Sequence, residues 1–375
     1  MSPKFDYESS GKKYEVTPIE LFFDLIYAFA VSQLTQYLLS DLSWQGMFRT
    51  LVMLIAIYMV WAYTSWAATM IRADQSATRW MILLVMFVGF FMNTSVVWAF
   101  SDSGWLFVAA FLVIQLGRTC WTIVHSPDDL FRDHFWRVFV WQAITAPIWI
   151  AGACVTSDFR IMLWLVAAGI DLLGTWLAHP IPGRRLFSED VDFDADHLLE
   201  RCRMFRLIAI GEMVFTLGAA ITGAQLNYMT VVLGIVTMAE IVSLWALTFG
   251  RFYGLVIEHL EKTRDPIRTS RYAINALAVI LFGLVAVSAA NQQIILHPYE
   301  APSPVLSFLL GGGPILFLVA QGWYLTAVPN VRPRLYVICG ILLLFASSVS
   351  CLFPAWITLI IIGLIFTVLA ILDSR

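Results

Sequence analysis

Apolar runs of about twenty residues recur along the whole chain, and they constrain its fold more than any other feature. An α-helix of that length crosses the roughly 30 Å hydrocarbon core of a bilayer. The composition agrees, because 13% of the residues are charged, whereas soluble domains have about 25%. We therefore expect an all-α, polytopic integral membrane protein, and a soluble fold is excluded.

Dividing these runs at their polar breaks predicts about twelve transmembrane helices in a single membrane domain. Residues 1–17 form a polar tail, 18–179 hold helices 1–6, 180–201 form an acidic loop, and 202–372 hold helices 7–12. The expected spans are roughly 18–40, 47–69, 80–100, 104–124, 136–156, 160–179, 202–224, 228–250, 272–295, 304–326, 335–352 and 354–372.

The basic residues test this count of spans. With the N-terminus in the cytoplasm, twenty Lys and Arg residues fall on one side, and only Arg49 and Arg160 fall on the other. Cytoplasmic loops of membrane proteins carry such an excess of positive charge. The sequence thus predicts a multi-pass protein of the cytoplasmic membrane with both termini in the cytoplasm. The polar N-terminal residues lack an apolar core and a cleavage site, so we do not expect a signal peptide.

Two carboxylates, Glu20 and Asp24, lie four residues apart inside the first apolar run, and therefore on one face of the expected helix. Each would cost roughly 2.5–3.5 kcal/mol at the centre of a lipid-facing helix. The expected depths, counted at about 1.5 Å per residue, place the deeper ionisable residues between the cytoplasmic interface and the midplane. This common depth predicts one carboxylate-rich pocket that binds a substrate or proton, made of Glu20, Asp24, Arg118, Asp171, Glu212 and Glu240.

Arg118 is the expected partner of Asp24 or Asp171 in this pocket, since it is the one basic residue predicted deep in a span. The alternative is a fixed network of salt bridges that only holds the helices together. A second motif, His197, Glu200 and Arg201, ends the acidic loop. His197 and Glu200 could ligate a metal, but an acidic run before a helix also caps its N-terminus, and we expect no metal.

A weak internal repeat relates the two sets of six spans. Glu20–Leu25 resembles Glu212–Leu217, and Trp61–Thr64 resembles Trp245–Thr248. Six spans separate the copies, so the two halves would have the same orientation in the membrane. Chance similarity between apolar helices is the alternative.

The motifs Pro18-Ile-Glu20-Leu-Phe-Phe-Asp24-Leu25, His197-Leu-Leu-Glu200-Arg201 and Ile210-Gly211-Glu212 resemble those of the bacterial low temperature requirement protein A (LtrA) family. The resemblance covers roughly residues 16–250, and it implies a multi-span membrane protein required for growth in the cold, without a defined substrate. Beyond that range, the histidine expected early in helix 9 is replaced by the run from Arg271 to Asn275.

These features favour a secondary transporter, proton-coupled through the carboxylates, over two alternatives. The alternatives are a non-catalytic membrane factor for low-temperature adaptation and a membrane-embedded enzyme at the cytoplasmic interface. The chain has no Gly-rich phosphate loop and no HExxH motif, so we expect neither an enzyme nor a cofactor. The expected partners are the lipid bilayer and a small solute or proton, and nucleic acid is not among them.

Overall fold

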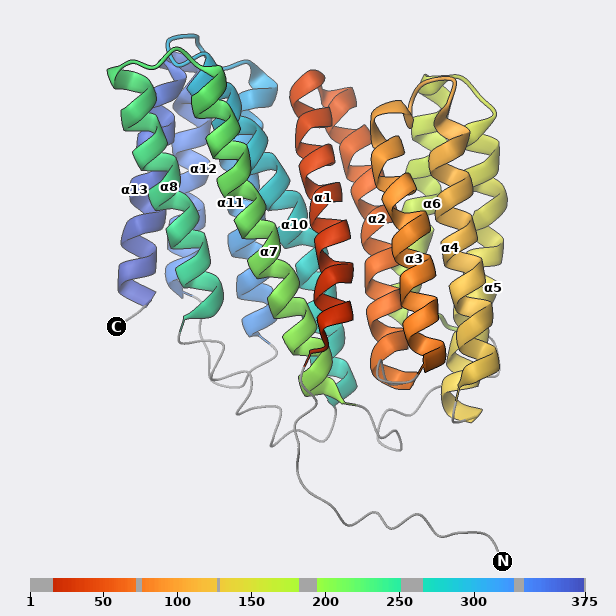
Figure 1. Cartoon of the computed structure of the whole chain (residues 1–375). Helices are drawn as coiled ribbons and strands as arrows, with labels where there is room; N and C mark the ends of the chain where they lie inside the picture. Colours follow the sequence, from red (N-terminus) through yellow and green to blue (C-terminus); the bar gives the residue numbers. More distant parts are fainter. Residues whose placement is uncertain are drawn as a thin grey trace, which may run out of the picture.

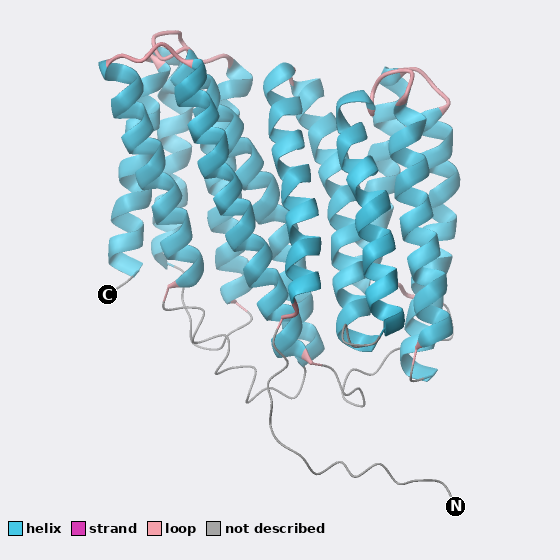
Figure 2. Ribbon diagram, in the orientation of Figure 1, coloured by secondary structure: helices cyan, strands magenta, loops and turns pink. Residues whose placement is uncertain are grey.

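The described part of the chain contains twelve α-helices (Figures 1 and 2). The computed structural model describes residues 16–71, 76–126, 129–181, 194–250, 266–326 and 334–373. The helices are α1 (Pro18–Ser40), α2 (Trp44–Ile71), α3 (Ser76–Thr94), α4 (Gly104–His125), α5 (Asp129–Ala153), α6 (Ser157–Leu177), α7 (Ala195–Gly223), α8 (Tyr228–Phe249), α10 (Pro266–Leu296), α11 (Pro304–Leu325), α12 (Arg334–Val349) and α13 (Ala355–Asp373). Short 3₁₀ turns follow α3 (η1, Ser95–Trp98) and α12 (η3, Ser350–Leu352).

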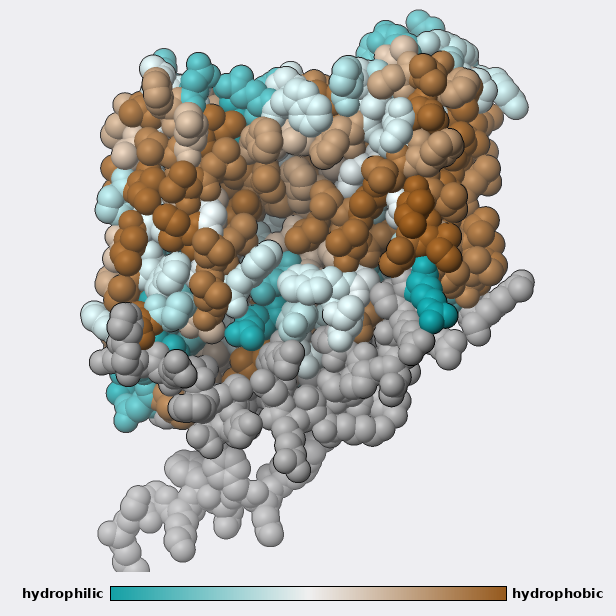
Figure 3. Space-filling view, turned by 180° about the vertical axis from the view of Figure 1, so that it is seen from behind, coloured by the Kyte–Doolittle hydropathy of each residue, from teal (hydrophilic) through white to brown (hydrophobic). Residues whose placement is uncertain are grey.

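Eleven of the described helices are long and apolar enough to cross a membrane. The twelfth, α5, has comparable length but carries Asp129, Arg132, Asp133 and Arg137 in its first turns. The first residues of α1 and the last residues of α13 lie on the same side of the bundle, as an even number of crossings requires (Figure 1). Hydrophobic residues cover the height of the face seen in Figure 3, and hydrophilic residues gather at its rims. The fold is that of a multi-pass membrane protein.

The helix boundaries agree with the predicted spans to within a few residues except at the starts of three helices on the N-terminal side of the bundle, the side on which α1 begins. α5 begins at Asp129 rather than at residue 136. α7 begins at Ala195 rather than at residue 202, because Asp194 caps it by accepting a hydrogen bond from the backbone of His197 at 2.9 Å. α10 begins at Pro266 rather than at residue 272. The end of the predicted acidic loop is therefore the first two turns of α7.

The helices pack in the same order within each half, which supports the predicted repeat. In the first half α1 packs on α2 and α3. Each helix from α3 to α5 then contacts the next one, and α6 contacts α2. In the second half α7 packs on α8 and α10. Each helix from α10 to α12 then contacts the next one, and α13 contacts α8. The halves meet where α1 and α2 contact α7 and α10.

Residues that occupy matching positions in the sequence repeat do not have equivalent surroundings in the structure. Trp61 is completely buried, whereas Trp245 is 48% exposed. Glu20 is fully buried, whereas Glu212 is only half-buried. Moreover, α2 is the most enclosed helix of the first half, and in the second half that position belongs to α10 rather than to α8. The two halves thus share a helix order but not their buried polar residues.

The two arginines on the opposite side of the bundle hold loops together. Arg160, at the start of α6, donates to the carbonyl oxygens of Gly152, Ala99 and Ser101 at 3.1, 2.9 and 2.6 Å. These carbonyls lie at or beyond helix ends, where the helix offers them no partner. Arg49 contacts Asp41 at 3.4 Å. Their structural roles account for the two exceptions to the charge asymmetry.

Candidate functional site: a charged cluster between the two halves

Glu20 and Asp24 both point from α1 into the bundle, and neither carboxylate side chain is exposed. Pro18 begins the helix, and its fixed φ favours the first turn. The backbone N–H and hydroxyl of Thr17 donate to Glu20 Oε2 at 3.0 and 2.8 Å. The i,i+4 spacing then places Asp24 one turn deeper on the same face.

His197 and Arg201 face these carboxylates from α7 with the same spacing of four residues. Both helices begin on the same side of the bundle, and both place their polar residues at the third and seventh positions. His197 therefore lies level with Glu20, and Arg201 lies level with Asp24. The two pairs form a cluster, called here the α1–α7 charge cluster, at the contact between the two halves.

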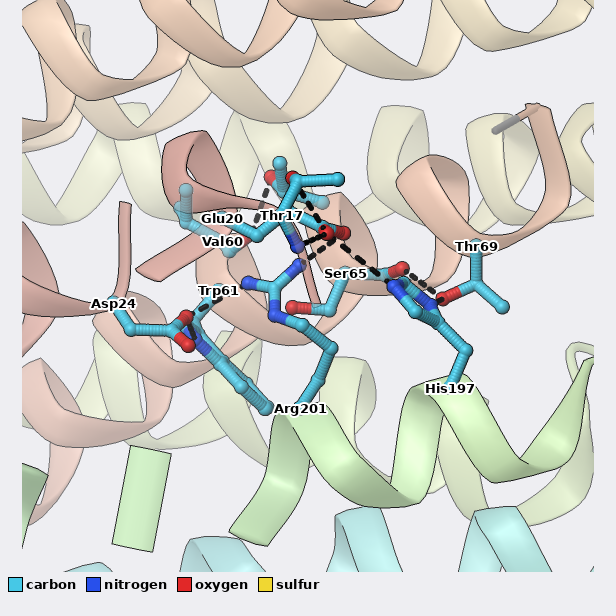
Figure 4. A network of polar contacts seen from close by, with 10 residues as sticks. Thr17, Glu20, Asp24, Val60, Trp61, Ser65, Thr69, His197 and Arg201 are labelled. Atoms are coloured by element: carbon cyan, nitrogen blue, oxygen red, sulfur yellow. Dashed lines mark hydrogen bonds and ion pairs between the residues drawn. The ribbon is translucent and has the colours of Figure 1, made fainter. Parts of the chain in front are cut away.

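Arg201 bridges both carboxylates (Figure 4). Its Nη1 lies 2.9 Å from Glu20 Oε1, and its Nη2 lies 2.7 Å from Asp24 Oδ1. Arg201 is 1% exposed, so these are fully desolvated, charge-assisted contacts. The planar guanidinium holds two acids at fixed positions, which a lysine could not do in the same geometry.

Aromatic side chains surround the deeper end of the cluster. Trp61 of α2 donates its indole N–H to Asp24 Oδ1 at 2.7 Å and stacks on Phe205 of α7, with ring centroids 4.6 Å apart. The Arg201 guanidinium lies 5.5 Å from the ring centre of Phe23 and 6.0 Å from that of Trp61. These rings exclude water and add cation–π attraction to the charge of Arg201.

His197 connects the other end of the cluster to α2. Its Nε2 lies 3.3 Å from Glu20 Oε2, and its Nδ1 lies 3.1 Å from the hydroxyl of Thr69. That hydroxyl also donates to the carbonyl of Ser65 at 2.9 Å. His197 therefore links Glu20 of α1 to Thr69 of α2.

The α1–α7 charge cluster holds two carboxylates and one guanidinium, so its net charge is −1 when His197 is neutral. One added proton, on the histidine or on a carboxylate, balances it. Two polar atoms in the cluster are buried and have no hydrogen-bond partner in the described part of the chain, Asp24 Oδ2 and Arg201 Nε. Asp24 therefore has a free oxygen on which a proton can be placed.

The structure does not bring the six predicted pocket residues together, and Arg118 does not pair with Asp24 or Asp171. Arg118, on α4, donates to the side chain of Gln115 at 2.5 Å and to the backbone carbonyl of Val60 at 3.2 Å. Asp171, on α6, accepts from Thr145 at 2.8 Å and from Trp149 at 3.0 Å. The hydrogen-bond partners of both residues are neutral groups of the first half.

Glu212 and Glu240 lie apart from the α1–α7 charge cluster as well. Glu212, on α7, is directed toward Ser32 of α1. Glu240, on α8, accepts from the amide of Asn291 at 2.7 Å. The prediction of a single shared pocket was wrong because depth along a helix says nothing about which way a side chain points around it.

Sequence reasoning missed three contributors, Thr17, Trp61 and Thr69, and it did not place His197 against Glu20 or Arg201 against Asp24. A usable signal existed, since two i,i+4 polar pairs of opposite character stand near the starts of helices that begin on the same side. Glu200 pairs with Arg203 at 3.2 Å. Among the described residues, no three His, Cys, Asp or Glu side chains are grouped so that they could hold a metal ion. Asp190 and Asp192 lie outside those residues.

Comparison with known proteins places the three motifs in one family. The model described as bacterial low temperature requirement A protein (LtrA) matches residues 15–371, which is nearly the whole chain. The chain belongs to the LtrA family. A protein of Rhizobium meliloti (strain 1021) named "Uncharacterized protein RA0937" is 28% identical to it over 332 residues, covering 88% of this chain and 81% of the relative. No solved structure matches.

The LtrA match extends through the second half, beyond the residue range in which the motifs alone indicated the resemblance. Two of the family-like motifs, Glu20–Asp24 and His197–Arg201, are the two sides of the α1–α7 charge cluster. The third, Gly211–Glu212, lies farther along α7 and outside it.

Proposed function

We propose that this LtrA protein is a proton-coupled secondary transporter of a small solute, in which the α1–α7 charge cluster controls the contact between the two halves. The observation that carries the proposal is the position of the cluster. Its carboxylates belong to the first half, its basic residues belong to the second, and it lies where the halves meet. Transporters built from two repeats move by tilting one repeat against the other.

Asp24 is the proposed site of the coupling proton. Glu20 is held by Arg201, His197 and Thr17, whereas Asp24 is held by Arg201 and Trp61 through one oxygen only. A proton placed on Oδ2 neutralises Asp24 and weakens its contact with Arg201, while Glu20 keeps Arg201 in place. The link between α1 and α7 then loosens without leaving an unpaired buried cation.

His197 adds a second contact between α7 and α1, one turn nearer the surface than the contact of Arg201 with Asp24. Its Nε2 lies 3.3 Å from Glu20 Oε2, so Glu20 stays linked to α7 by two side chains. The excess of acid in the cluster favours solutes that are cationic or that move together with a proton.

The test is a flux measurement in lipid vesicles. The purified protein is reconstituted with a pH-sensitive dye trapped inside, a panel of small cationic and neutral solutes is added, and the rate of proton movement is recorded. We expect a solute-dependent proton flux in the wild-type protein and its loss, by at least about tenfold, in Asp24→Asn. Asp171→Asn removes a buried carboxylate that makes no contact with the cluster, and it should retain the flux.

Two results would contradict the proposal. The first is a solute-dependent proton flux that is unchanged in Asp24→Asn. The second is Asp24→Asn protein that remains folded, shown by a monodisperse elution profile, while Asp171→Asn loses the flux to the same extent. In that second case the loss of flux is not specific to the contact between α1 and α7.

A further inference from the structure

A second buried carboxylate lies in the other half of the molecule without a basic partner. Glu240, on α8, is 1% exposed, and the amide of Asn291 on α10 donates to its Oε2 at 2.7 Å. No Lys, Arg or His of the described residues forms an ion pair with it. A buried ionised carboxylate with one neutral donor is strongly unfavourable, so a proton or a bound cation must balance its charge.

A small cavity lies between α7, α8 and α10, and it is lined by neighbours of Glu240 rather than by Glu240 itself. Its volume is about 10 Å³, close to the space that one water molecule needs. Its polar lining comes from all three helices: Thr216, Thr237, Ser288, Asn291 and Gln292. Apolar side chains such as Met213 and Ile295 complete it. The cavity lining thus combines hydroxyl and amide side chains around a space for one water molecule or one small ion.

Thr237 indicates that this space has a polar occupant. The residue is 2% exposed, it lines the cavity, and its hydroxyl oxygen has no hydrogen-bond partner in the described part of the chain. Most threonines of helices in this protein donate to a carbonyl of their own helix, as Thr248 does to Leu244 at 2.8 Å. A buried hydroxyl without that bond is destabilising unless something in the cavity contacts it.

The geometry of α8 and α10 connects Glu240 to the cavity. Thr237 precedes Glu240 by three residues, and Ile241 follows it directly, so the carboxylate stands on the same stretch of helix as two lining residues. Asn291 lines the cavity and donates its NH₂ group to Glu240. Its carbonyl oxygen is therefore left as an acceptor.

We propose that the cavity between α7, α8 and α10 binds a monovalent alkali cation, with Glu240 supplying the balancing charge and Thr237, Ser288 and Asn291 supplying neutral oxygen ligands. Hard cations prefer oxygen ligands, and the cavity has room for a bare cation but not for one with its hydration shell. The site lies wholly in the second half. It shares no residue with the α1–α7 charge cluster, and it does not depend on the proposed transport activity.

The test is cation binding to the full-length protein in detergent, followed by thermal unfolding. The probes are NaCl and KCl, each compared with choline chloride at the same ionic strength. We expect at least one of the two alkali cations to raise the Tm by about 2–5 °C at saturation. Glu240→Gln should abolish this rise, and Thr237→Val should weaken the apparent affinity by roughly five- to tenfold.

Thr248→Val is the matched control, because it removes a threonine hydroxyl from the same helix without touching the cavity. It should bind the cation as tightly as the wild-type protein does. No rise in Tm with either cation, or an equal rise in Glu240→Gln, overturns the proposal. If Glu240→Gln does not fold, an apparent affinity in Thr237→Val equal to that in Thr248→Val overturns it as well.

Discussion

Arg201 is the residue on which the buried acids of the first helix depend. It is the basic group that contacts both Glu20 and Asp24 in the described part of the chain, and its side chain is 1% exposed. Removing one member of such a network leaves uncompensated charges in a low-dielectric interior, whereas removing all members leaves none. The stability of the network and its specific geometry can therefore be separated by mutation.

Arg201→Met should lower the free energy of unfolding by roughly 3–5 kcal/mol, since it leaves two carboxylates without a cation. The triple variant Glu20→Gln, Asp24→Asn, Arg201→Met should recover most of that loss, because no charge remains to be paired. Thermal unfolding in detergent measures both. A triple variant no more stable than Arg201→Met would show that the charges are not coupled. A recovered triple variant that still lacks proton flux would separate function from folding.

At the scale of helices, α6 ends in a conformation that its sequence disfavours. Ala178 and His179 have φ values of 58° and 53°, in the left-handed region that residues with a Cβ avoid. The backbone N–H of Ala178 reaches the carbonyls of Gly174 and Thr175 and so closes the helix. Glycine is the usual residue at such a helix end, and alanine pays the steric penalty here.

Ala178→Gly should therefore stabilise the protein by about 1 kcal/mol, since glycine adopts positive φ without strain. Ala168→Gly, in the right-handed interior of the same helix, should instead destabilise it by about 1 kcal/mol or more. The comparison uses the Tm of both variants under one set of conditions. Changes of the same sign in the two variants would show that the helix end is not strained.

At the scale of the whole molecule, the even number of helices and the charge asymmetry together predict the orientation in the membrane. The N-terminal side of the bundle carries the basic residues, so it should face the cytoplasm. Arg49 and Arg160 on the opposite side are engaged with loop groups, so they do not weaken the prediction.

Fusion proteins measure this orientation. Alkaline phosphatase fused after Arg375 should be inactive, because the enzyme needs an oxidising compartment for its disulfides, and a green fluorescent protein at that point should fluoresce. The same phosphatase fused after Glu300, in the exposed connection between α10 and α11, should be active. The opposite pattern would place both ends of the chain outside the cytoplasm.

The sequence predicted the helices well, because the length of an apolar run is set by the thickness of the bilayer. It predicted less of the cluster. Glu20 and Asp24 stood out by their burial in an apolar run, but the expected partner of Asp24 was Arg118 instead of Arg201. Arg201 was placed at the end of the acidic loop, because the cap at Asp194 was not recognised as the start of α7.

The pocket prediction failed for a related reason. Depth along each helix can be counted from the sequence, but rotation about the helix axis depends on packing against helices that are distant in the chain. Arg118 and Asp171 are buried with neutral partners of the first half, and Glu240 accepts a hydrogen bond from Asn291 in the second half. The prediction therefore grouped residues that lie at the same depth in the membrane but on different faces of their helices.

The bond between Asp24 and Arg201 also sets an order of events during biosynthesis. The two residues are 177 positions apart in the chain. At about 5–20 residues per second, roughly ten to thirty-five seconds pass between their syntheses. During that interval α1 is made and its acids have no arginine. The nascent first half must keep Glu20 and Asp24 protonated or in contact with water until α7 emerges. The contact between the two halves can therefore form only when the seventh helix docks against the first.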